Sequence, residues 1–294
     1  MIKVGCCGYP VSMKRYYESF SLVEVNTTFY NYPRSSTVEG WRAKAPENFE
    51  FTVKAHQDIS HKFRLKPEKS CLEAFERMKE ICKILDSKVL VVQTPASFRP
   101  DKLDDAREFF SKINREGLTV VWETRGPAWE KTEIRKKLAE TLKKLDVPHV
   151  TDPFKTSPVY TGKIAYFRLH GLGEKLYYYQ YSDKELEKLH KIVESYEEKT
   201  EDVYVLFNNL SMFDDAARFV YYIENGKFPS LTGAVGIESV RNVLSKTRYP
   251  TNKSLLLKRV GWKLVEVKEG RQIRLEELLK EIPSRTYENV DELL

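Results

Sequence analysis

The sequence repeats one pattern, a short apolar run suited to a β-strand that ends in charged or amide side chains. In residues 22–30 the strand-forming residues Leu22, Val23 and Val25 come first, and polar residues gather toward the end. The pattern returns at residues 51–56, 89–93, 119–125, 165–170 and 203–208. A chain built in this way is predicted to present the C-terminal ends of its strands to one common site.

Helical segments separate these runs. Residues 68–85, for example, carry Leu72, Phe75 and Met78 at helical spacing. Strands that alternate with helices eight times are typical of a (β/α)₈ barrel, which needs roughly 250 residues. We therefore predict an α/β protein whose residues 1–228 form a TIM (β/α)₈-type barrel. Ser36 or Thr37 is expected to cap one of its helices, and Ser182 another.

The pattern changes after residue 228. Two strand-like runs flank Glu269 and Gly270, which predicts a β-hairpin, and a short helix is expected at residues 276–282. Residues 229–294 are therefore predicted to form a small C-terminal appendage of hairpin and helix, packed on or beside the barrel.

The cysteines do not suggest disulfides or a zinc site. Cys6 and Cys7 are neighbours on a strand and point to opposite faces. Cys71 and Cys82 lie on one predicted helix about 16 Å apart, too far for a bond. All four are interpreted as small buried thiols of a reducing compartment. The sequence has no apolar run of about 20 residues and no signal peptide. The chain is therefore predicted to be cytoplasmic and not membrane-bound.

The charge balance favours an anionic partner only mildly. The net charge is +6, from 49 basic and 43 acidic residues. Charged residues make up 31% of the chain, and this surplus of Lys and Glu is what hyperthermophile surfaces tend to show. A thermophilic protein with an anionic small molecule or nucleic acid as partner is the resulting expectation.

Barrel enzymes carry their working groups at the C-terminal ends of strands and in the loops that follow. Three candidates are predicted to act as catalytic acid or base groups: Glu24, Glu123 and His170. The candidates for substrate binding are Asn26, Lys54, His61, Gln93, Arg125, Trp129, Arg168, Tyr181 and Asn208. For any single member, a structural ion pair or packing contact is an equally good interpretation.

The charges of the candidates point to an anion. Lys54, Arg125 and Arg168 would place three cations in one cleft, which suits a phosphate, a carboxylate or a nucleic-acid backbone better than a neutral sugar. Aromatic residues near the same strand ends are suited to stacking on bases, although packing is their ordinary role.

Arg168 and His170 lie two residues apart on one predicted strand and are therefore expected to face the barrel interior together. A buried unpaired charge is costly, so a carboxylate should lie close to Arg168, and Glu24 or Glu123 is the expected source. Replacing Arg168 with Met is expected to abolish anion binding and to leave the barrel folded.

No metal site is predicted, because the chain has five His and too few of them follow strands. A single divalent ion on Glu24 and Glu123 is kept as an alternative. No organic cofactor is indicated, since Gly171 and Gly173 alone do not make a phosphate-binding loop.

Several short motifs carry a resemblance to a known family. They are residues 4–9, 24–30, 51–54 with 58–61, 93–98, 123–125 with Trp129, 168–171, 181–182 and 207–209. In this order they resemble the YecE-like family, a group of TIM-barrel proteins also called domain of unknown function 72. The resemblance covers residues 3–224 and implies the barrel and a site at its C-terminal face, but no reaction. The chain departs from it at Gly126, where many members have His.

The leading hypothesis is a hydrolase that acts on a phosphate-bearing or nucleic-acid-like substrate. One alternative is a non-catalytic nucleic-acid-binding protein that also uses Arg259, Lys263, Arg271 and Arg274 of the appendage. Another is a glycosidase-like enzyme that uses Glu24 and Glu123 as paired carboxylates. A third is a small-molecule-binding or scaffold protein that has lost its activity.

Overall fold

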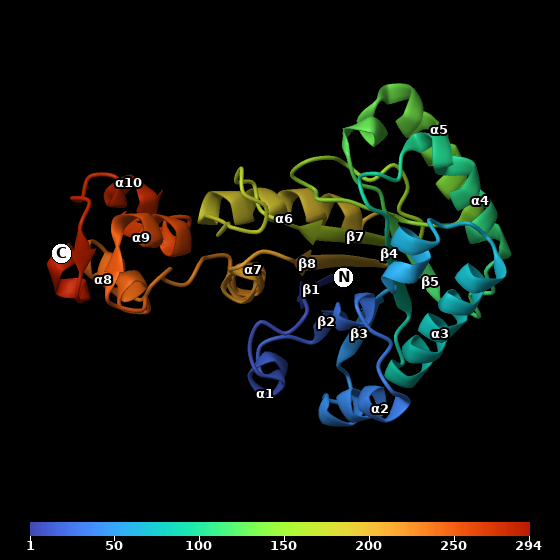
Figure 1. Cartoon of the computed structure of the whole chain (residues 1–294), viewed down its shortest axis with the longest axis horizontal. Helices are drawn as coiled ribbons and strands as arrows, with labels where there is room; N and C mark the ends of the chain where they lie inside the picture. Colours follow the sequence, from blue (N-terminus) through green and yellow to red (C-terminus); the bar gives the residue numbers. More distant parts are fainter. The chain divides into compact units, whose positions relative to one another are not determined.

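The computed structural model describes all residues 1–294. The chain forms two compact units (Figure 1). The first contains residues 1–169 and 191–208, and the second contains residues 170–190 and 209–294. Each unit is described by itself.

The first unit is a barrel of eight parallel strands. The strands are β1 (Ile2–Cys7), β2 (Leu22–Val25), β3 (Glu50–Lys54), β4 (Val89–Gln93), β5 (Thr119–Glu123), β6 (His149–Val150), β7 (Ile164–Leu169) and β8 (Asp202–Phe207). They pair in the order β6-β5-β4-β3-β2-β1-β8-β7. The sheet closes where Thr151, directly after β6, makes a parallel bridge to Phe167 of β7. The prediction of a TIM-type barrel is confirmed.

Helices follow most of the strands. They are α1 (Met13–Tyr17), α2 (Ser35–Lys44), α3 (Lys69–Leu85), α4 (Leu103–Lys112), α5 (Thr132–Leu145), α6 (Asp183–Glu197) and α7 (Met212–Asn225). Figure 1 shows α2 to α5 on the outside of the strands, and α3 buries Phe75 and Met78 from its apolar stripe. No helix lies between β6 and β7.

The two expected helix caps have different outcomes. Ser182 caps α6 as predicted, because its Oγ accepts a hydrogen bond from the Glu185 N–H at 3.4 Å and donates one to the Glu185 carboxylate. The cap expected at Ser36 or Thr37 is wrong. Helix α2 already begins at Ser35, after Arg34 in extended conformation, and no side chain caps it.

The barrel interior is lined by alternate residues of each strand, as the period of two requires. An apolar layer includes Leu22, Val91, Val121 and Leu206, all buried. Gly5 lets β1 approach β2, because a Cβ there would lie 2.3 Å from the Leu22 carbonyl oxygen. Polar side chains lie at both ends of this layer, and those at the C-terminal end form the candidate site.

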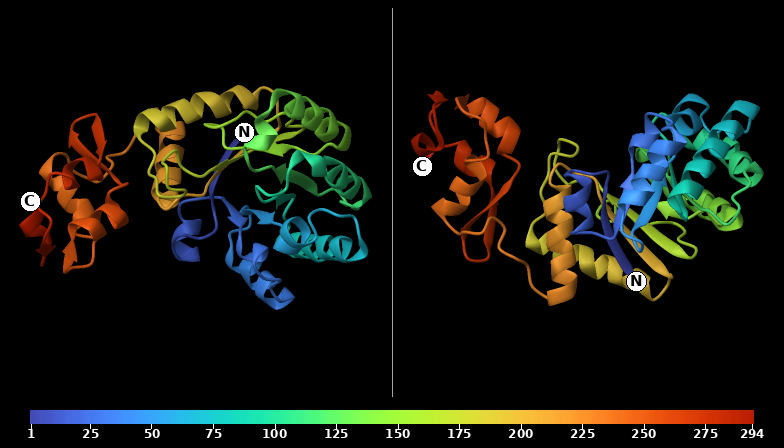
Figure 2. Two further views of the ribbon diagram at one scale, coloured as in Figure 1. Left: turned by 45° about the horizontal axis from the view of Figure 1, so that its top comes forward. Right: turned by 90° about the horizontal axis from the view of Figure 1, so that it is seen from below.

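The second unit contains α7 and the end of the chain, drawn in orange to red in Figure 2. Its further elements are α8 (Ile237–Leu244), β9 (Thr251–Asn252), α9 (Lys253–Val260), β10 (Leu264–Lys268), β11 (Arg271–Arg274), α10 (Leu275–Leu279) and β12 (Thr286–Tyr287). The antiparallel pairing of β10 with β11 confirms the predicted hairpin. Val240, Leu256, Val265 and Leu275 belong to its apolar core. Because residues 170–190 and 209–228 also belong to this unit, the boundary at residue 228 stays a prediction.

The four cysteines are buried and form no disulfide, as expected. None of the helices combines the length and the apolar character needed to cross a bilayer.

Candidate functional site

Arg168 is the centre of a charged network at the C-terminal end of the barrel. Its side chain is fully buried and lies between Glu24 and Glu123. Its Nε and Nη2 donate to the two oxygens of Glu24 at 3.0 and 2.8 Å, and its Nη1 donates to Glu123 at 2.5 Å. The predicted inward orientation of Arg168 and its pairing with these carboxylates are confirmed. Although burial alone would lower the pKa of the guanidinium, its anionic neighbours raise it well above its usual value.

Glu24 is fully buried and has its hydrogen bonds supplied by the protein. Besides the two bonds from Arg168, its Oε2 accepts one from the Tyr166 hydroxyl at 2.9 Å. The Tyr166 hydroxyl also lies 2.8 Å from Thr52 Oγ1. This environment favours a positioning role, in which Glu24 orients Arg168, over direct contact with a substrate.

Glu123 connects the buried part of the network to its solvent-exposed edge. Its Oε2 binds Arg168, and its Oε1 accepts a hydrogen bond from Arg125 Nε at 2.7 Å. The side chain of Arg125 is 27% exposed. Gln93 also points into this layer, and its Oε1 lies 3.4 Å from Arg168 Nη1. Arg125 therefore offers a cation that a ligand can reach, held in place by a buried carboxylate.

Lys54 ends β3 and is held from two sides by residues that follow β2. The Thr28 hydroxyl lies 2.7 Å from the Lys54 carbonyl oxygen and 2.9 Å from that of Val25, which ties the ends of β2 and β3 together. The Lys54 ammonium lies 4.1 Å from the centre of the Phe29 ring, in cation–π contact. It makes no hydrogen bond to a carboxylate. Burial, together with the charge of Arg168, lowers the pKa of Lys54 to about 8.

His61 lies close enough to the cations of the site for their positive charge to affect its pKa. It belongs to η2 (Asp58–Lys62), a short π-helical segment after β3, and its ring contacts Phe29 edge to face at 5.0 Å. Burial lowers the pKa of its imidazole, and Lys54, Arg125 and Arg64 lower it further. Nδ1 of His61 lies 2.8 Å from Ser60 Oγ. The imidazole is therefore neutral at pH 7, and a neutral imidazole can both donate and accept a hydrogen bond.

Asn26 follows β2 directly and carries an unsatisfied donor. Its Nδ2 is buried and has no hydrogen-bond partner in the protein. Such a group costs free energy unless a ligand or water binds it. The amide N–H of Asn26 is therefore available to donate a hydrogen bond to an acceptor atom of a ligand or water.

We use the term mouth cluster for Glu24, Lys54, Glu123, Arg125 and Arg168. Its three cations face two carboxylates, and the carboxylates bind Arg168 and Arg125. Lys54 is the cation whose charge no hydrogen-bonded carboxylate offsets. The cluster is therefore chemically suited to an anion.

The two carboxylates do not fit a bridging metal ion. Arg168 already bonds to both, so a cation occupies the position that a divalent ion on Glu24 and Glu123 would take. No group of three or more His, Cys, Asp or Glu lies where it could hold a metal ion.

The environment of Trp129 is that of a packing residue rather than a substrate-binding one. It is buried, its indole N–H donates to the Phe98 carbonyl oxygen at 2.9 Å, and its ring stacks with Phe98. This favours the packing interpretation for Trp129. Asn208 follows β8, and its backbone N–H donates to Leu169 O at 2.8 Å.

His170 and Tyr181 belong to the second unit. β7 ends at Leu169, one residue before His170, and Gly171 has a φ of +90°. The His170 ring is tilted against Tyr177 at 6.0 Å. The Tyr181 hydroxyl accepts a hydrogen bond from the Gly171 N–H at 2.9 Å. The roles of both residues stay predictions.

Tyr166, Thr52 and Thr28 support the site and were absent from the sequence prediction, whereas Phe29 was expected only as one of the aromatic residues near the strand ends. Tyr166 precedes Arg168 by two residues and Thr52 precedes Lys54 by two, so the strand period held a signal for both. Thr28 and Phe29 lie in η1 (Thr27–Phe29), a short 3₁₀ helix whose direction the strand pattern does not predict.

Gly126, where the family resemblance leads one to expect His, lines a small surface cavity. Its φ of +101° is strained for other residues, and a Cβ there would lie 3.4 Å from Ala96. The cavity measures about 260 Å³ and also contains Arg99 and Lys131. The backbone turn itself therefore disfavours a side chain at this position.

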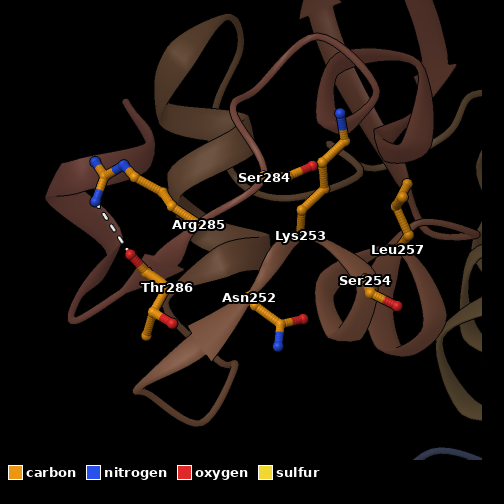
Figure 3. Close-up of a pocket in the computed structure, with 7 residues that line it drawn as sticks. All are labelled: Asn252, Lys253, Ser254, Leu257, Ser284, Arg285 and Thr286. Carbon is orange, nitrogen blue, oxygen red and sulfur yellow. Dashed lines mark hydrogen bonds between the residues drawn. The ribbon is translucent and has the colours of Figure 1, made fainter.

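A second cavity, of about 550 Å³, lies in the appendage (Figure 3). Its two cations have partners in the protein. Lys253 Nζ donates to the carbonyl oxygens of Lys280 and Ile282, and Arg285 donates to Thr286 O and to Glu292. Arg274 of the hairpin is likewise engaged, since it donates to the carbonyl oxygens of Gln180 and Trp262. These contacts leave little basis for a phosphate-binding surface at Arg274 or Arg285.

Solved structures of similar fold support the barrel. A DUF72 family protein from Enterococcus faecalis V583 is 24% identical, with a TM-score of 0.63 over 76% of this chain and 98% of that chain. A DUF72 family protein from Thermotoga maritima MSB8 is also 24% identical, with a TM-score of 0.62 over 76% of this chain and 100% of that one. A D-tagatose 3-epimerase-like protein is 17% identical, with a TM-score of 0.51 over 76% and 96%. At these identities the likeness shows the fold alone.

Sequence comparison is more direct. The UPF0759 protein YunF of Bacillus subtilis (strain 168) is 27% identical over 243 residues, which cover 73% of this chain and 84% of YunF. The family model described as "Protein of unknown function DUF72" matches residues 9–225, which include the whole mouth cluster. The chain therefore belongs to the DUF72 family.

Proposed function

We propose that the C-terminal end of the barrel is the active site of a hydrolase that acts on a phosphate-bearing or nucleic-acid-like substrate. The observation that carries the proposal is the surplus of positive charge in the mouth cluster, with Lys54 bound to no carboxylate. Burying a cation in this way is costly unless a ligand uses it. A phosphate has the negative charge and the acceptor oxygens that such a site lacks.

In this proposal Lys54 and Arg125 bind the phosphate, and Asn26 donates its unsatisfied amide hydrogen to it. Glu123 is the carboxylate nearer to solvent and accepts a proton from the attacking water, with His61 as a second acceptor. Arg168 holds Glu123 in place through a hydrogen bond, and Glu24 in turn holds Arg168. As phosphate charge develops, the fixed cations stabilise it in a site partly shielded from water.

A paired-carboxylate glycosidase is less well supported. Its acid and base must each reach the substrate, whereas Glu24 is fully buried and bound by Arg168 and Tyr166. A purely nucleic-acid-binding function draws no support from Arg274, which is held within the second unit.

The test combines binding and turnover. Inorganic phosphate should raise the melting temperature of the wild type, and p-nitrophenyl phosphate and bis(p-nitrophenyl) phosphate should release nitrophenolate. Arg125→Gln should weaken phosphate binding about ten- to hundredfold, because a hydrogen bond to a charged group is worth about 1.5–3 kcal/mol. Lys88→Gln is the matched control, since Lys88 is an exposed cation that precedes β4 at the opposite end of the barrel.

Equal phosphate binding by wild type, Arg125→Gln and Lys54→Met would show that the mouth cluster is not the anion site. Binding that weakens as predicted without turnover of either ester, or of a single-stranded oligonucleotide, would reject hydrolysis and retain the anion site. Binding restricted to nucleic acid, with a steep dependence on salt and no cleavage, would favour the non-catalytic alternative.

A further inference from the structure

The first unit contains two buried lysines with opposite surroundings. The first, Lys79 on α3, is 9% exposed, and its Nζ reaches Glu76 at 2.7 Å, Glu116 at 2.8 Å and the Asn114 carbonyl oxygen at 3.3 Å. Lys54 is 8% exposed, yet its Nζ has the face of Phe29 at 4.1 Å and no hydrogen-bonded carboxylate. One ammonium is thus satisfied by acceptors, and the other rests on an aromatic ring.

The protonation behaviour follows these surroundings. The hydrogen bonds that Lys79 donates to Glu116 and Glu76 raise its pKa. Burial and the charge of Arg168 lower the pKa of Lys54 to about 8, although Glu24 and Glu123 act in the opposite direction, and Arg125 makes a smaller lowering contribution. A substantial fraction of Lys54 is therefore a neutral amine near pH 8, and a neutral amine is a nucleophile.

We propose that Lys54 is an amine nucleophile that forms an imine with the aldehyde or ketone group of a phosphate-bearing substrate. This inference rests on the proposed anion site and changes one role in it: Arg125 and Asn26 hold the phosphate, and Lys54 bonds to the carbonyl carbon of the substrate instead. It narrows the substrate class from phosphate esters in general to those that carry a carbonyl group, such as sugar phosphates.

The covalent step needs no oxidant or reductant. The lone pair of Lys54 Nζ forms a bond to the carbonyl carbon as the carbonyl π bond breaks, and the proton that the nitrogen loses passes to the carbonyl oxygen to give a carbinolamine. The hydroxyl group then takes a proton and leaves as water, while the nitrogen lone pair forms the carbon–nitrogen double bond and the nitrogen gives up its second proton. The reverse reaction with water releases the carbonyl compound and the free amine.

His61 is placed to carry protons in these steps. The Phe29 ring is shared by both groups, since Lys54 lies over its face and the His61 ring contacts it edge to face at 5.0 Å. Burial and the nearby cations lower the pKa of His61, so its imidazole is neutral when Lys54 begins to lose its proton. Phe29 thus brings the amine and a proton acceptor to one side of the site.

Thr28 fixes the nucleophile in place. Its hydroxyl lies within hydrogen-bond distance of the Lys54 carbonyl oxygen, and Thr28 itself is fully buried. The base of the Lys54 side chain is therefore held at the end of β3.

The experiment uses pyridoxal 5′-phosphate, which combines an aldehyde with a phosphate, followed by reduction with sodium borohydride and peptide mapping by mass spectrometry. At limiting reagent we expect the stable adduct on Lys54 ahead of the exposed lysines. The rate should rise with pH around a midpoint of about 8. Inorganic phosphate should slow the labelling. Lys79 is the internal control and should label more slowly than Lys54, because its ammonium is bound to two carboxylates that raise its pKa.

Lys54→Met and Lys54→Arg should remove this adduct while circular dichroism shows a folded barrel, and Lys88→Arg should label like the wild type. If phosphate raises the melting temperature but Lys54 labels no faster than the exposed lysines, the nucleophile is rejected and the anion site stands. If pyridoxal without phosphate labels Lys54 as fast as pyridoxal 5′-phosphate, and phosphate gives no protection, the anion site and the substrate class both fail.

Discussion

The two ends of the barrel interior pair their charged side chains in different ways. At the N-terminal end, Lys3 lies between Glu50 and Asp202, with Nζ to oxygen distances of 2.8 and 2.9 Å. The Tyr204 hydroxyl donates to Glu50. One cation thus binds two carboxylates, and each of these side chains is about a quarter exposed, so water shares in their solvation.

At the C-terminal end, the mouth cluster sets three cations against two carboxylates, and its centre is closed to water. The two ends therefore differ in whether every cation is hydrogen-bonded to a carboxylate. The ion pairs of the N-terminal cluster serve to stabilise the fold. The C-terminal cluster contains Lys54, which has no hydrogen bond to a carboxylate, at the end where barrel enzymes bind their substrates.

The largest expected effect is at the centre of the mouth cluster. Arg168→Met should destabilise the protein by about 3–5 kcal/mol, because it leaves two buried carboxylates without their cation. This revises the expectation from sequence that the variant stays folded because its volume is kept. Urea unfolding followed by circular dichroism measures the change. Stability equal to that of the wild type would contradict the central role of Arg168.

Arg125→Gln should act on binding rather than on folding. We expect weaker phosphate binding with a loss of stability below about 1 kcal/mol, because the side chain of Arg125 is partly exposed. Calorimetric titration with phosphate and urea unfolding of the same variant separate the two effects. A large loss of stability with unchanged binding would place Arg125 with the residues that serve to stabilise the fold.

Lys3→Met tests the other end. The expected loss of stability is about 1 kcal/mol, because water still reaches Glu50 and Asp202. Phosphate binding should stay at the wild-type level, and titration with phosphate checks this. A fall in phosphate affinity similar to that of Arg125→Gln would break the distinction between the two ends.

The smallest effect is the pH dependence that Lys54 gives to stability. Its folded-state pKa of about 8 lies below the ordinary value of 10.5, so the unfolded chain binds more protons between these values. Lys54 therefore costs stability below pH 8, and the cost fades as the pH rises toward 10.5. Lys54→Met should be more stable than the wild type at pH 7, by about 1 kcal/mol, with the advantage shrinking toward pH 10. A difference in unfolding free energy that does not vary with pH would contradict the lowered pKa of Lys54.

Much of the fold could be predicted from local patterns. Apolar runs that end in polar residues predicted the strands, and the confirmed inward position of Arg168 follows from the period of two. The hairpin around Gly270 followed from its turn residues. The start of α2 was missed because the prediction relied on Ser36 or Thr37 as a cap, whereas the helix begins at Ser35 without any side-chain cap.

The pairing of the charged residues with one another could be seen only in the tertiary structure. The sequence determined that Glu24, Lys54, Glu123, Arg125 and Arg168 lie at strand ends, because alternation and strand length depend on neighbours along the chain. It did not determine that Arg168 takes both carboxylates and that Lys54 is left on Phe29. Those pairings join residues of different strands up to 144 positions apart, and they depend on the closure of the barrel and on the 3₁₀ turn at Thr28. Only the closed barrel decides which charge is buried with a partner and which is kept for a ligand.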